Sequence, residues 1–232
     1  MINYEDLVDN PNFITKYVTR GTRDNLFALS LLGHDSPVSI TNEEFNFIEN
    51  FIIEKGLKRG YEIATGCGIS ALAAGLGFKK TVGKLITMDC YMEEFYNDGT
   101  FGNKEKILFT KSDGYKSVKQ LIDFYDIKNE VIPKIGISPK DTKNKIKEVF
   151  CDVDKNKLDY IFIDGQHTGD AIVDDIKSIL DFIDDGTFIL FHDIHIYGGI
   201  YSFSEITKKY FKKNTKIVVP QPLGFDLGLL DV

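Results

Sequence analysis

The sequence has few cysteines, and their spacing is not that of a metal site or a disulfide framework. The three cysteines, Cys67, Cys90 and Cys151, are an odd number and include no Cys-x-x-Cys pair. This pattern argues against a disulfide framework and against a cysteine-based zinc site.

The sequence also lacks long hydrophobic runs. No apolar segment approaches the roughly 18–20 residues that a membrane-spanning helix requires. The first residues, Met-Ile-Asn-Tyr-Glu-Asp, are acidic and do not have the basic-then-apolar order of a signal peptide. No internal repeat and no low-complexity tract is found. We therefore expect a cytoplasmic protein that does not associate with a membrane.

The composition carries no excess of positive charge. Lysine and arginine together number 28, against 35 aspartates and glutamates, and the net charge is −7. This balance argues against a nucleic-acid partner, whose phosphates require clustered basic side chains. The 232 residues and the 43% hydrophobic content suit one large domain with a sizeable core. We expect a small-molecule substrate, and the sequence leaves a homo-oligomer open.

What the sequence does contain is a central strand–helix–strand stretch. Two apolar runs, Tyr160–Ile163 and Phe188–Phe191, flank a segment whose apolar residues recur with the period of an α-helix. Such a βαβ unit has parallel strands whose carboxyl ends share one edge of the sheet. Open α/β sheets bind ligands at that edge. The polar residues that follow the two runs should therefore meet there: Asp164, His167, His192, Asp193 and His195.

Strand-like and helix-like segments alternate on both sides of this unit. The expected strands are Gly60–Ala64, Lys84–Met88, Val131–Ile137, Tyr160–Ile163, Phe188–Phe191, Lys216–Val219 and Phe225–Leu230. The last two are separated by a link too short for a parallel crossover, so they should be antiparallel. The predicted fold class is α/β: a doubly wound, Rossmann-like, seven-stranded and mostly parallel sheet whose last strand is antiparallel.

Two segments lie outside this alternation. Residues 1–58 are expected to form an N-terminal helical extension or cap, and residues 59–232 the main domain. In the extension, Thr41 and Glu44 have the spacing of a capping box, and the phenylalanine-rich helix that follows should end near Gly56. That helix would serve as core or as a subunit contact. Residues 90–111 carry several aromatic residues between glycines, which suits either a lid or an ordinary surface loop.

A glycine turn follows the first expected strand and reads Glu62-Ile-Ala-Thr-Gly-Cys-Gly-Ile-Ser. Glycines let backbone approach a ligand closely, and the next helix offers free N–H groups. A dinucleotide fingerprint would fit with Ala71 in its third glycine position. Glu62 instead favours a ligand ammonium group, because a buried carboxylate needs a partner. Asp89, which ends the next strand, would accept hydrogen bonds from ribose hydroxyls whether the ligand is a dinucleotide or one with an ammonium group. A purely structural role for this glycine turn remains an alternative.

Residues 60–231 resemble the class I S-adenosylmethionine-dependent methyltransferases. The resemblance rests on Glu-x-x-x-Gly-x-Gly-x-Ser after the first strand, which is similar to the first motif of that family. It implies that Asp89 binds the ribose of the cofactor and that Ser138, after the third strand, lines the adenine pocket. It also implies a set of residues that hold the methionine moiety of S-adenosylmethionine: Glu62, Thr65, Gly66, Cys67 and Gly68.

The stretch Phe-Ile-Asp-Gly-Gln-His…Phe-His-Asp-Ile-His resembles a metal-dependent subgroup of that family. The subgroup includes the relatives of cephalosporin-biosynthesis proteins, the macrolide-sugar O-methyltransferases and, more distantly, catechol O-methyltransferase. The resemblance implies a divalent metal, magnesium or manganese, on Asp164, His192 and Asp193, and a general base at His167. His192 departs from the closer relatives, which carry Glu there. Neutral imidazole suits manganese, iron or zinc better than magnesium.

Together these residues predict methyl transfer to an oxygen of a small hydroxylated molecule, such as a sugar or a natural product. A metal on Asp164 would lower the pKa of the acceptor hydroxyl, and His167 would take its proton, with His195 in reserve. Simpler structural roles stay open: a helix cap for Asp164, a surface position for His167 and a core-edge position for His192.

Two other functions compete with methyl transfer. A nicotinamide-dependent oxidoreductase would use the glycine turn and Asp89. It is disfavoured by Glu62 within the strand, and because no Tyr-x-x-x-Lys pair follows the fourth or fifth strand; the nearest match begins at Tyr115. A non-catalytic relative would hold the nucleoside alone, and the presence of the complete set of site residues argues against it.

Overall fold

The computed structural model describes residues 18–19, 28–29, 40, 42–66, 68–91, 111–165, 169–192, 209, 216–218 and 228–231. The strands of the main sheet are β3 (Arg59–Ile63), β4 (Lys84–Asp89), β5 (Val131–Ile135), β6 (Tyr160–Ile163), β7 (Phe188–Phe191), β8 (Lys216–Val218) and β9 (Gly228–Asp231). The helices are α2 (Asn42–Lys55), α3 (Ile69–Thr81), α5 (Lys111–Phe124), α6 (Thr142–Val149) and α7 (Gly169–Ile179), which continues into the 3₁₀ segment η2 (Leu180–Phe182).

The main sheet has seven strands in the order β5-β4-β3-β6-β7-β9-β8. Neighbouring strands from β5 to β7 pair in parallel, whereas β9 is antiparallel to both β7 and β8. From β3 the chain winds outward to β4 and β5 and then returns to place β6 on the other side of β3. The doubly wound α/β fold predicted from the sequence is confirmed. Its switch point, where such folds bind ligands, lies between β3 and β6.

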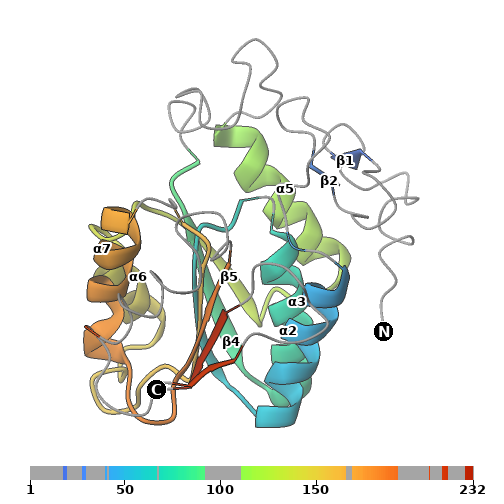
Figure 1. Cartoon of the computed structure of the whole chain (residues 1–232). Coiled ribbons are helices and arrows are strands. Elements are labelled where there is room, and N and C mark those ends of the chain that lie inside the picture. Colours follow the sequence, from blue (N-terminus) through green and yellow to red (C-terminus); the bar gives the residue numbers. More distant parts are fainter. Residues whose placement is uncertain are drawn as a thin grey trace.

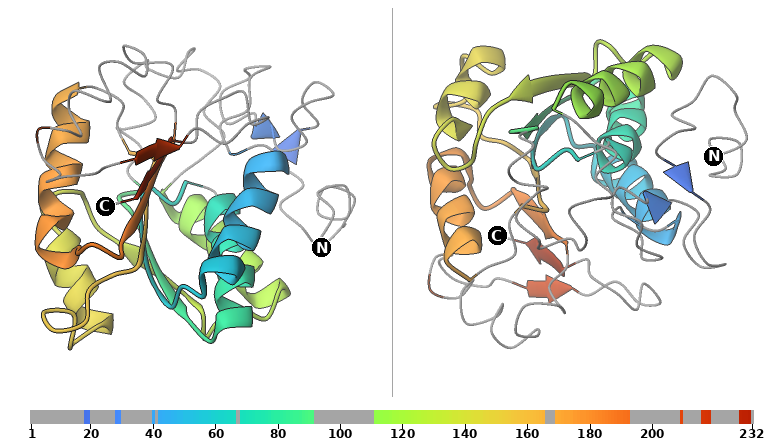
Figure 2. Two further views of the ribbon diagram at one scale, coloured as in Figure 1. Left: turned by 60° about the horizontal axis from the view of Figure 1, so that its bottom comes forward. Right: turned by 90° about the horizontal axis from the view of Figure 1, so that it is seen from above.

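The helices cover both faces of the sheet. Figure 1 shows α2, α3 and α5 on one face and α6 and α7 on the other, and both views in Figure 2 keep this three-layer arrangement. Strand β5 lies at one edge of the sheet. This position suits Pro133 within the strand, because proline cannot donate a ladder hydrogen bond.

Strand β6 shows why its sequence is apolar without interruption. Tyr160 and Phe162 belong to the core under α2, α3 and α5, and Ile161 and Ile163 belong to the core under α6 and α7. Alternate residues of a strand point to opposite faces, so a strand covered on both sides needs apolar residues at every position. A buried polar residue inside such a strand is therefore exceptional, and Glu62 in β3 is one.

The N-terminal region contributes to the same core as the main domain. Phe45 and Phe51 of α2 are buried in the cluster that also holds residues of α3 and β6, so the phenylalanine-rich face is core. Ahead of α2 the structure places the short strands β1 (Val18–Thr19) and β2 (Ala28–Leu29), paired antiparallel. At these four positions the structure has paired strands within the segment that the sequence predicted to be a helical extension.

Among the described residues, no helix is both long enough and apolar enough to cross a membrane. The predicted lid lies outside the described residues for positions 92–110.

Candidate active site at the carboxyl edge of the sheet

The backbone between β3 and α3 turns through residues with positive φ. The φ angle is 69° at Ala64, 53° at Gly66 and 88° at Gly68. The Gly68 N–H donates to the Thr65 carbonyl at 2.8 Å, which closes the turn just before α3 begins. A positive φ is uncommon at a residue other than glycine, and Ala64 therefore marks backbone that its surroundings hold in place. Cys67 lies outside the described residues.

The two glycines of this turn differ in how much room surrounds them. A Cβ added at Gly68 would lie 3.0 Å from the Val118 Cγ2 atom, whereas a Cβ added at Gly66 would meet no atom within 4 Å. We predict that Gly68→Ala lowers the free energy of unfolding by roughly 2–3 kcal/mol, through backbone strain and crowding. Gly66→Ala should cost about 1 kcal/mol, through backbone strain alone. Urea unfolding of both variants measures the two losses in the free energy of unfolding. Equal losses in the two variants would contradict the prediction that Gly68→Ala costs more.

The Asp89 carboxylate ties the glycine turn to the end of β4. Its Oδ2 atom accepts the Gly66 N–H at 2.8 Å, and its Oδ1 atom accepts the Tyr91 N–H at 2.8 Å. The Asp89 carbonyl accepts the Gly136 N–H, at 3.0 Å, from the loop after β5. Burial raises the pKa of the Asp89 carboxyl, and the amide hydrogen bonds work against this rise. Asp89 is therefore the point where three strand-end loops meet.

Glu62 lies beneath the turn in a chain of buried hydroxyl groups. Its carboxylate accepts hydrogen bonds from the Ser70 hydroxyl of α3 and the Thr87 hydroxyl of β4. The hydroxyl oxygens of Thr87 and Thr65 lie 2.5 Å apart. Burial raises the pKa of the Glu62 carboxyl to about 8. The sequence predicted a ligand ammonium group as the partner of this acid, and in the structure two hydroxyl groups already occupy its oxygens.

Negative charge gathers at this edge of the sheet. The charges of Asp164 and Asp89 raise the pKa of Glu62 further, after the larger effect of burial. The three carboxyl groups come from β3, from β4 and from the position after β6, on both sides of the switch point. Because the raised pKa keeps Glu62 largely protonated at neutral pH, the negative charge at this edge comes from Asp89 and Asp164, and it favours a cationic ligand.

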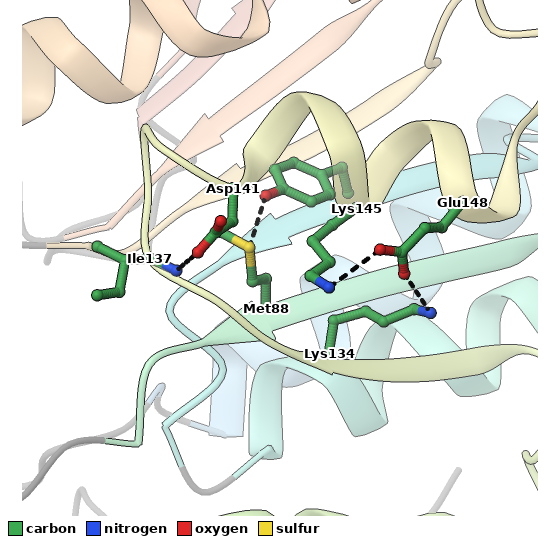
Figure 3. Close-up of polar contacts among 7 residues, drawn as sticks. Met88, Lys134, Ile137, Asp141, Lys145 and Glu148 are labelled. Atoms are coloured by element: carbon green, nitrogen blue, oxygen red, sulfur yellow. Dashed lines mark hydrogen bonds and ion pairs between the residues drawn. The ribbon is translucent and has the colours of Figure 1, made fainter.

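The loop after β5 is fixed by its own hydrogen bonds. The Ile137 N–H donates to the Asp141 carboxylate at 2.9 Å, as Figure 3 shows. The Ser138 hydroxyl donates to the Asp175 carboxylate of α7. A Cβ added at Gly165, after β6, would lie 2.6 Å from the Asp175 Oδ2 atom. Asp175 thus joins the loops after β5 and β6, and the Ser138 hydroxyl is engaged within the protein.

Asp164 and His192 are brought together by the pairing of β6 with β7. The two strands are parallel with Ile163 opposite Phe191, and the His192 N–H donates to the Ile163 carbonyl at 3.0 Å. The next residue of each strand is then at the same level, and His192 Nδ1 lies 3.2 Å from Asp164 Oδ1. The predicted convergence of these two residues is confirmed. The other members of that cluster, His167, Asp193 and His195, lie outside the described residues.

The Asp164–His192 pair has the spacing of two ligands on one ion. Two donors about 2.1 Å from a metal and roughly 100° apart at it are separated by about 3.2 Å, which is the distance between Asp164 Oδ1 and His192 Nδ1. Within the part of the chain that the structure describes, no group of three or more His, Cys, Asp or Glu residues is arranged to hold a metal ion. Asp164 and His192 supply two donors among these described residues, which is fewer than a metal site requires.

Glu44 was not predicted to belong to this site. The sequence indicated a capping role toward Thr41, a residue that lies outside the described ones. In the structure the Glu44 side chain is buried, and its Oε2 atom lies 3.5 Å from His192 Nε2. Ser70 and Thr87 were also missed as partners of Glu62. Thr87 lies opposite Glu62 in the register of β3 with β4, and no local sequence pattern marks that pairing.

The fold and the site together define a class of protein. A doubly wound sheet with a glycine turn after β3, an acid at the end of β4 and a carboxylate–histidine pair after β6 and β7 has the layout of Rossmann-like folds, which bind ligands at this edge. Residues 61–194 match the family described as Methyltransferase domain, and the chain belongs to that family. It is a class I S-adenosylmethionine-dependent methyltransferase. The nicotinamide-dependent alternative is thereby set aside.

Solved structures share the fold at low sequence identity. The O-methyltransferase from Bacillus cereus in complex with SAH is 13% identical, with a TM-score of 0.58 over 83% of this chain and 80% of that one. The O-methyltransferase TomG from Streptomyces achromogenes, involved in tomaymycin synthesis and solved with SAM, is 12% identical, with a TM-score of 0.57 over 84% and 80%. A putative O-methyltransferase from Klebsiella pneumoniae is 12% identical, with a TM-score of 0.56 over 84% and 81%. No curated protein matches the sequence.

Proposed function

We propose that this protein transfers the methyl group of S-adenosylmethionine to a hydroxyl oxygen of a small molecule, such as a sugar or a natural product, with the help of a divalent metal. The observation that carries the proposal is the Asp164–His192 pair at the ligand-binding edge, with 3.2 Å between Nδ1 and Oδ1. The names of the solved neighbours, which are O-methyltransferases with SAM or SAH bound, favour an oxygen acceptor.

The cofactor would lie over the glycine turn. We propose that the turn holds the methionine moiety of the cofactor through Thr65, Gly66, Cys67 and Gly68. Asp89 would accept hydrogen bonds from the ribose hydroxyls of the cofactor. The open space above Gly66 supports this placement. Glu62 supports the turn from below through Ser70 and Thr87. The backbone of the loop that carries Ser138 would line the adenine pocket. The Ser138 hydroxyl itself is hydrogen-bonded to the Asp175 carboxylate.

Asp164, His192 and Asp193 would hold the divalent metal, with manganese preferred over magnesium because one donor is an imidazole. A divalent ion there supplies positive charge that lowers the pKa of an acceptor hydroxyl. His167, three residues after Asp164, would take the acceptor proton.

The N-terminal extension, residues 1–58, would form part of the acceptor side of the site. The contact of Glu44 in α2 with His192 supports this placement, because it brings the extension to the carboxyl edge of the sheet. Substrate specificity would then come from this extension rather than from the strand ends that hold the methyl donor.

The test is methyl transfer from S-adenosylmethionine labelled in its methyl group to a panel of small hydroxylated acceptors, each paired with an analogue that lacks the hydroxyl. The reactions are run with manganese, with magnesium and with a chelator. We expect labelled methyl ethers that disappear in the chelator. Transfer to nitrogen or carbon acceptors alone, or transfer at the full rate in the chelator, would contradict the proposal.

A further inference from the structure

Thr87 is a fully buried polar residue of β4 that lies between an acid of the sheet and the glycine turn. It stands opposite Glu62 in the register of β3 with β4, and its hydroxyl donates to the Glu62 carboxylate. The Thr87 hydroxyl oxygen also lies 2.5 Å from that of Thr65 in the turn. A buried hydroxyl group is costly unless it is hydrogen-bonded, and Thr87 has a partner on each side. It therefore links Glu62 to the turn.

The number of available protons sets the direction of these hydrogen bonds. A hydroxyl group has one proton to donate and lone pairs with which to accept. Because Thr87 gives its proton to Glu62, the proton between Thr87 and Thr65 has to come from Thr65. The Thr65 oxygen then has only lone pairs to offer to a ligand. The two hydroxyl groups thus carry the acceptor character of the Glu62 carboxylate to the turn.

The second oxygen of Glu62 makes this direction compatible with a charged or a neutral acid. Its Oε1 atom faces the Ser70 hydroxyl, and its Oε2 atom faces the Thr87 hydroxyl. A protonated carboxyl can place its proton on Oε1 and donate it to Ser70, because a hydroxyl also accepts. Thr87 then still donates to Oε2. An acceptor at Thr65 is available in both states, and a ligand cation favours it over the reverse direction.

Strand β4 anchors the glycine turn at two positions. Thr87 holds Thr65 through the pair of hydroxyls, and the Asp89 carboxylate holds the Gly66 N–H at 2.8 Å. Residues 87 and 89 point to the same face of the sheet, because alternate residues of a strand do so. A Cβ added at Gly66 would meet no atom within 4 Å, which leaves room for a ligand against the turn. Since Asp89 is the proposed ribose partner, the anchor at Thr65 is available to the methionine end of the cofactor.

We propose that Thr87 is a positioning residue for the ammonium group of the methyl donor, to which it presents an oxygen lone pair through the Thr65 hydroxyl. An ammonium group has three N–H donors and no acceptor, so it binds lone pairs, whereas a carboxylate needs donors. The inference rests on the proposed placement of the cofactor over the glycine turn and extends it to a residue outside that turn. It also gives the buried Glu62 an effect on cofactor binding without direct contact.

The test uses two pairs of ligands, each of which isolates one part of the methionine end. S-adenosylmethionine and its decarboxylated form are both sulfonium compounds with an ammonium group, and only the first has a carboxylate. S-adenosylhomocysteine and 5′-methylthioadenosine are both thioethers, and only the first has the amino-acid end. Calorimetry measures the Kd of all four ligands for wild type and for each variant.

The variants separate the hydroxyl group from the shape of the side chain. Thr87→Val keeps the shape and removes the hydroxyl, and Thr87→Ser keeps the hydroxyl. The matched control is Thr81→Val, which removes a hydroxyl that donates to the Leu57 carbonyl at the far end of α3 from the turn. Thr65→Val removes the other half of the same link and tests the inference independently of how well Thr87→Val folds.

We expect Thr87→Val to bind the three ligands that carry an ammonium group about tenfold more weakly. Its Kd for 5′-methylthioadenosine should stay at the wild-type value, which also shows that the variant is folded. Thr87→Ser and Thr81→Val should match wild type for all four ligands. Thr65→Val should show the same selective loss, and the double variant with Thr87→Val should lose no more than either single variant, because both substitutions break one link.

Three results would overturn the role of Thr87. These are an equal loss for all four ligands, no loss for any of them, or a loss for S-adenosylmethionine that its decarboxylated form does not share, which would assign the contact to the carboxylate. A wild type that binds S-adenosylhomocysteine no more tightly than 5′-methylthioadenosine would instead overturn the placement of the methionine end over the turn. A folded wild type that binds none of the four would overturn the proposed function itself.

Discussion

Asp164→Asn is expected to lower kcat/KM for methyl transfer by about 10³-fold while leaving the Kd of S-adenosylmethionine unchanged. The substitution keeps the shape of the side chain and removes its charge. In the structure this charge lies 3.2 Å from His192 and on the far side of the switch point from the glycine turn. Under the proposed function the Asp164 charge would act on the acceptor and the metal, and the turn and Asp89 would still hold the methyl donor.

Asp174→Asn is the matched control for this prediction. Asp174 is an exposed carboxylate on α7 whose contact is an ion pair with Lys177 at 3.4 Å, and exposed pairs of this kind contribute about 0–1 kcal/mol. The kcat/KM of the Asp174→Asn variant should equal that of wild type. Steady-state kinetics give the ratio, and calorimetry gives the Kd. A loss smaller than about tenfold in Asp164→Asn would remove Asp164 from the chemistry.

The second large effect is expected in the pH dependence of stability. The pKa of Glu62 is raised by burial from 4.5 to about 8. Between these values the folded protein keeps a proton that the unfolded chain has lost, so the free energy of unfolding falls as the pH rises. The slope from this group is about 1 kcal/mol per pH unit, and its stabilising contribution is fully present below about pH 4.5.

Glu62→Gln should remove this slope. The amide resembles the protonated carboxyl in shape and in its ability to donate, and the hydroxyls of Ser70 and Thr87 can rotate to accept or donate as needed. The variant should therefore be more stable than wild type at pH 8 and close to it at pH 5. Urea unfolding over this range, with Glu54→Gln as control, gives both curves. Parallel curves for wild type and Glu62→Gln would show that Glu62 ionises normally in the folded protein.

The sheet was predictable from the sequence because its signals are local. Strands such as Tyr160–Ile163 are apolar at every position, and the links between them have helical periodicity. Parallel pairing then requires the residues after two adjacent strands to meet. The contact between Asp164 and His192 follows from these rules alone and needs no knowledge of the side-chain packing.

The partners of the buried acids could not be predicted, because they depend on contacts between distant segments. Thr87 meets Glu62 only through the register of β3 with β4, which a single sequence does not specify. Glu44 meets His192 only because α2 packs over the same face of the sheet as α3. Its local pattern predicted a helix cap instead. Tertiary packing decides such contacts, and periodicity carries no information about them.

The most direct test of the account is calorimetric titration of the purified protein with S-adenosylmethionine, with NADH as the competing ligand and Asp89→Ala as the control variant. The account predicts one S-adenosylmethionine site per chain, no heat from NADH, and a site that is strongly weakened in Asp89→Ala because the ribose hydroxyls lose their acceptor. A folded wild-type protein that binds no S-adenosylmethionine, or that binds NADH in its place, would contradict it.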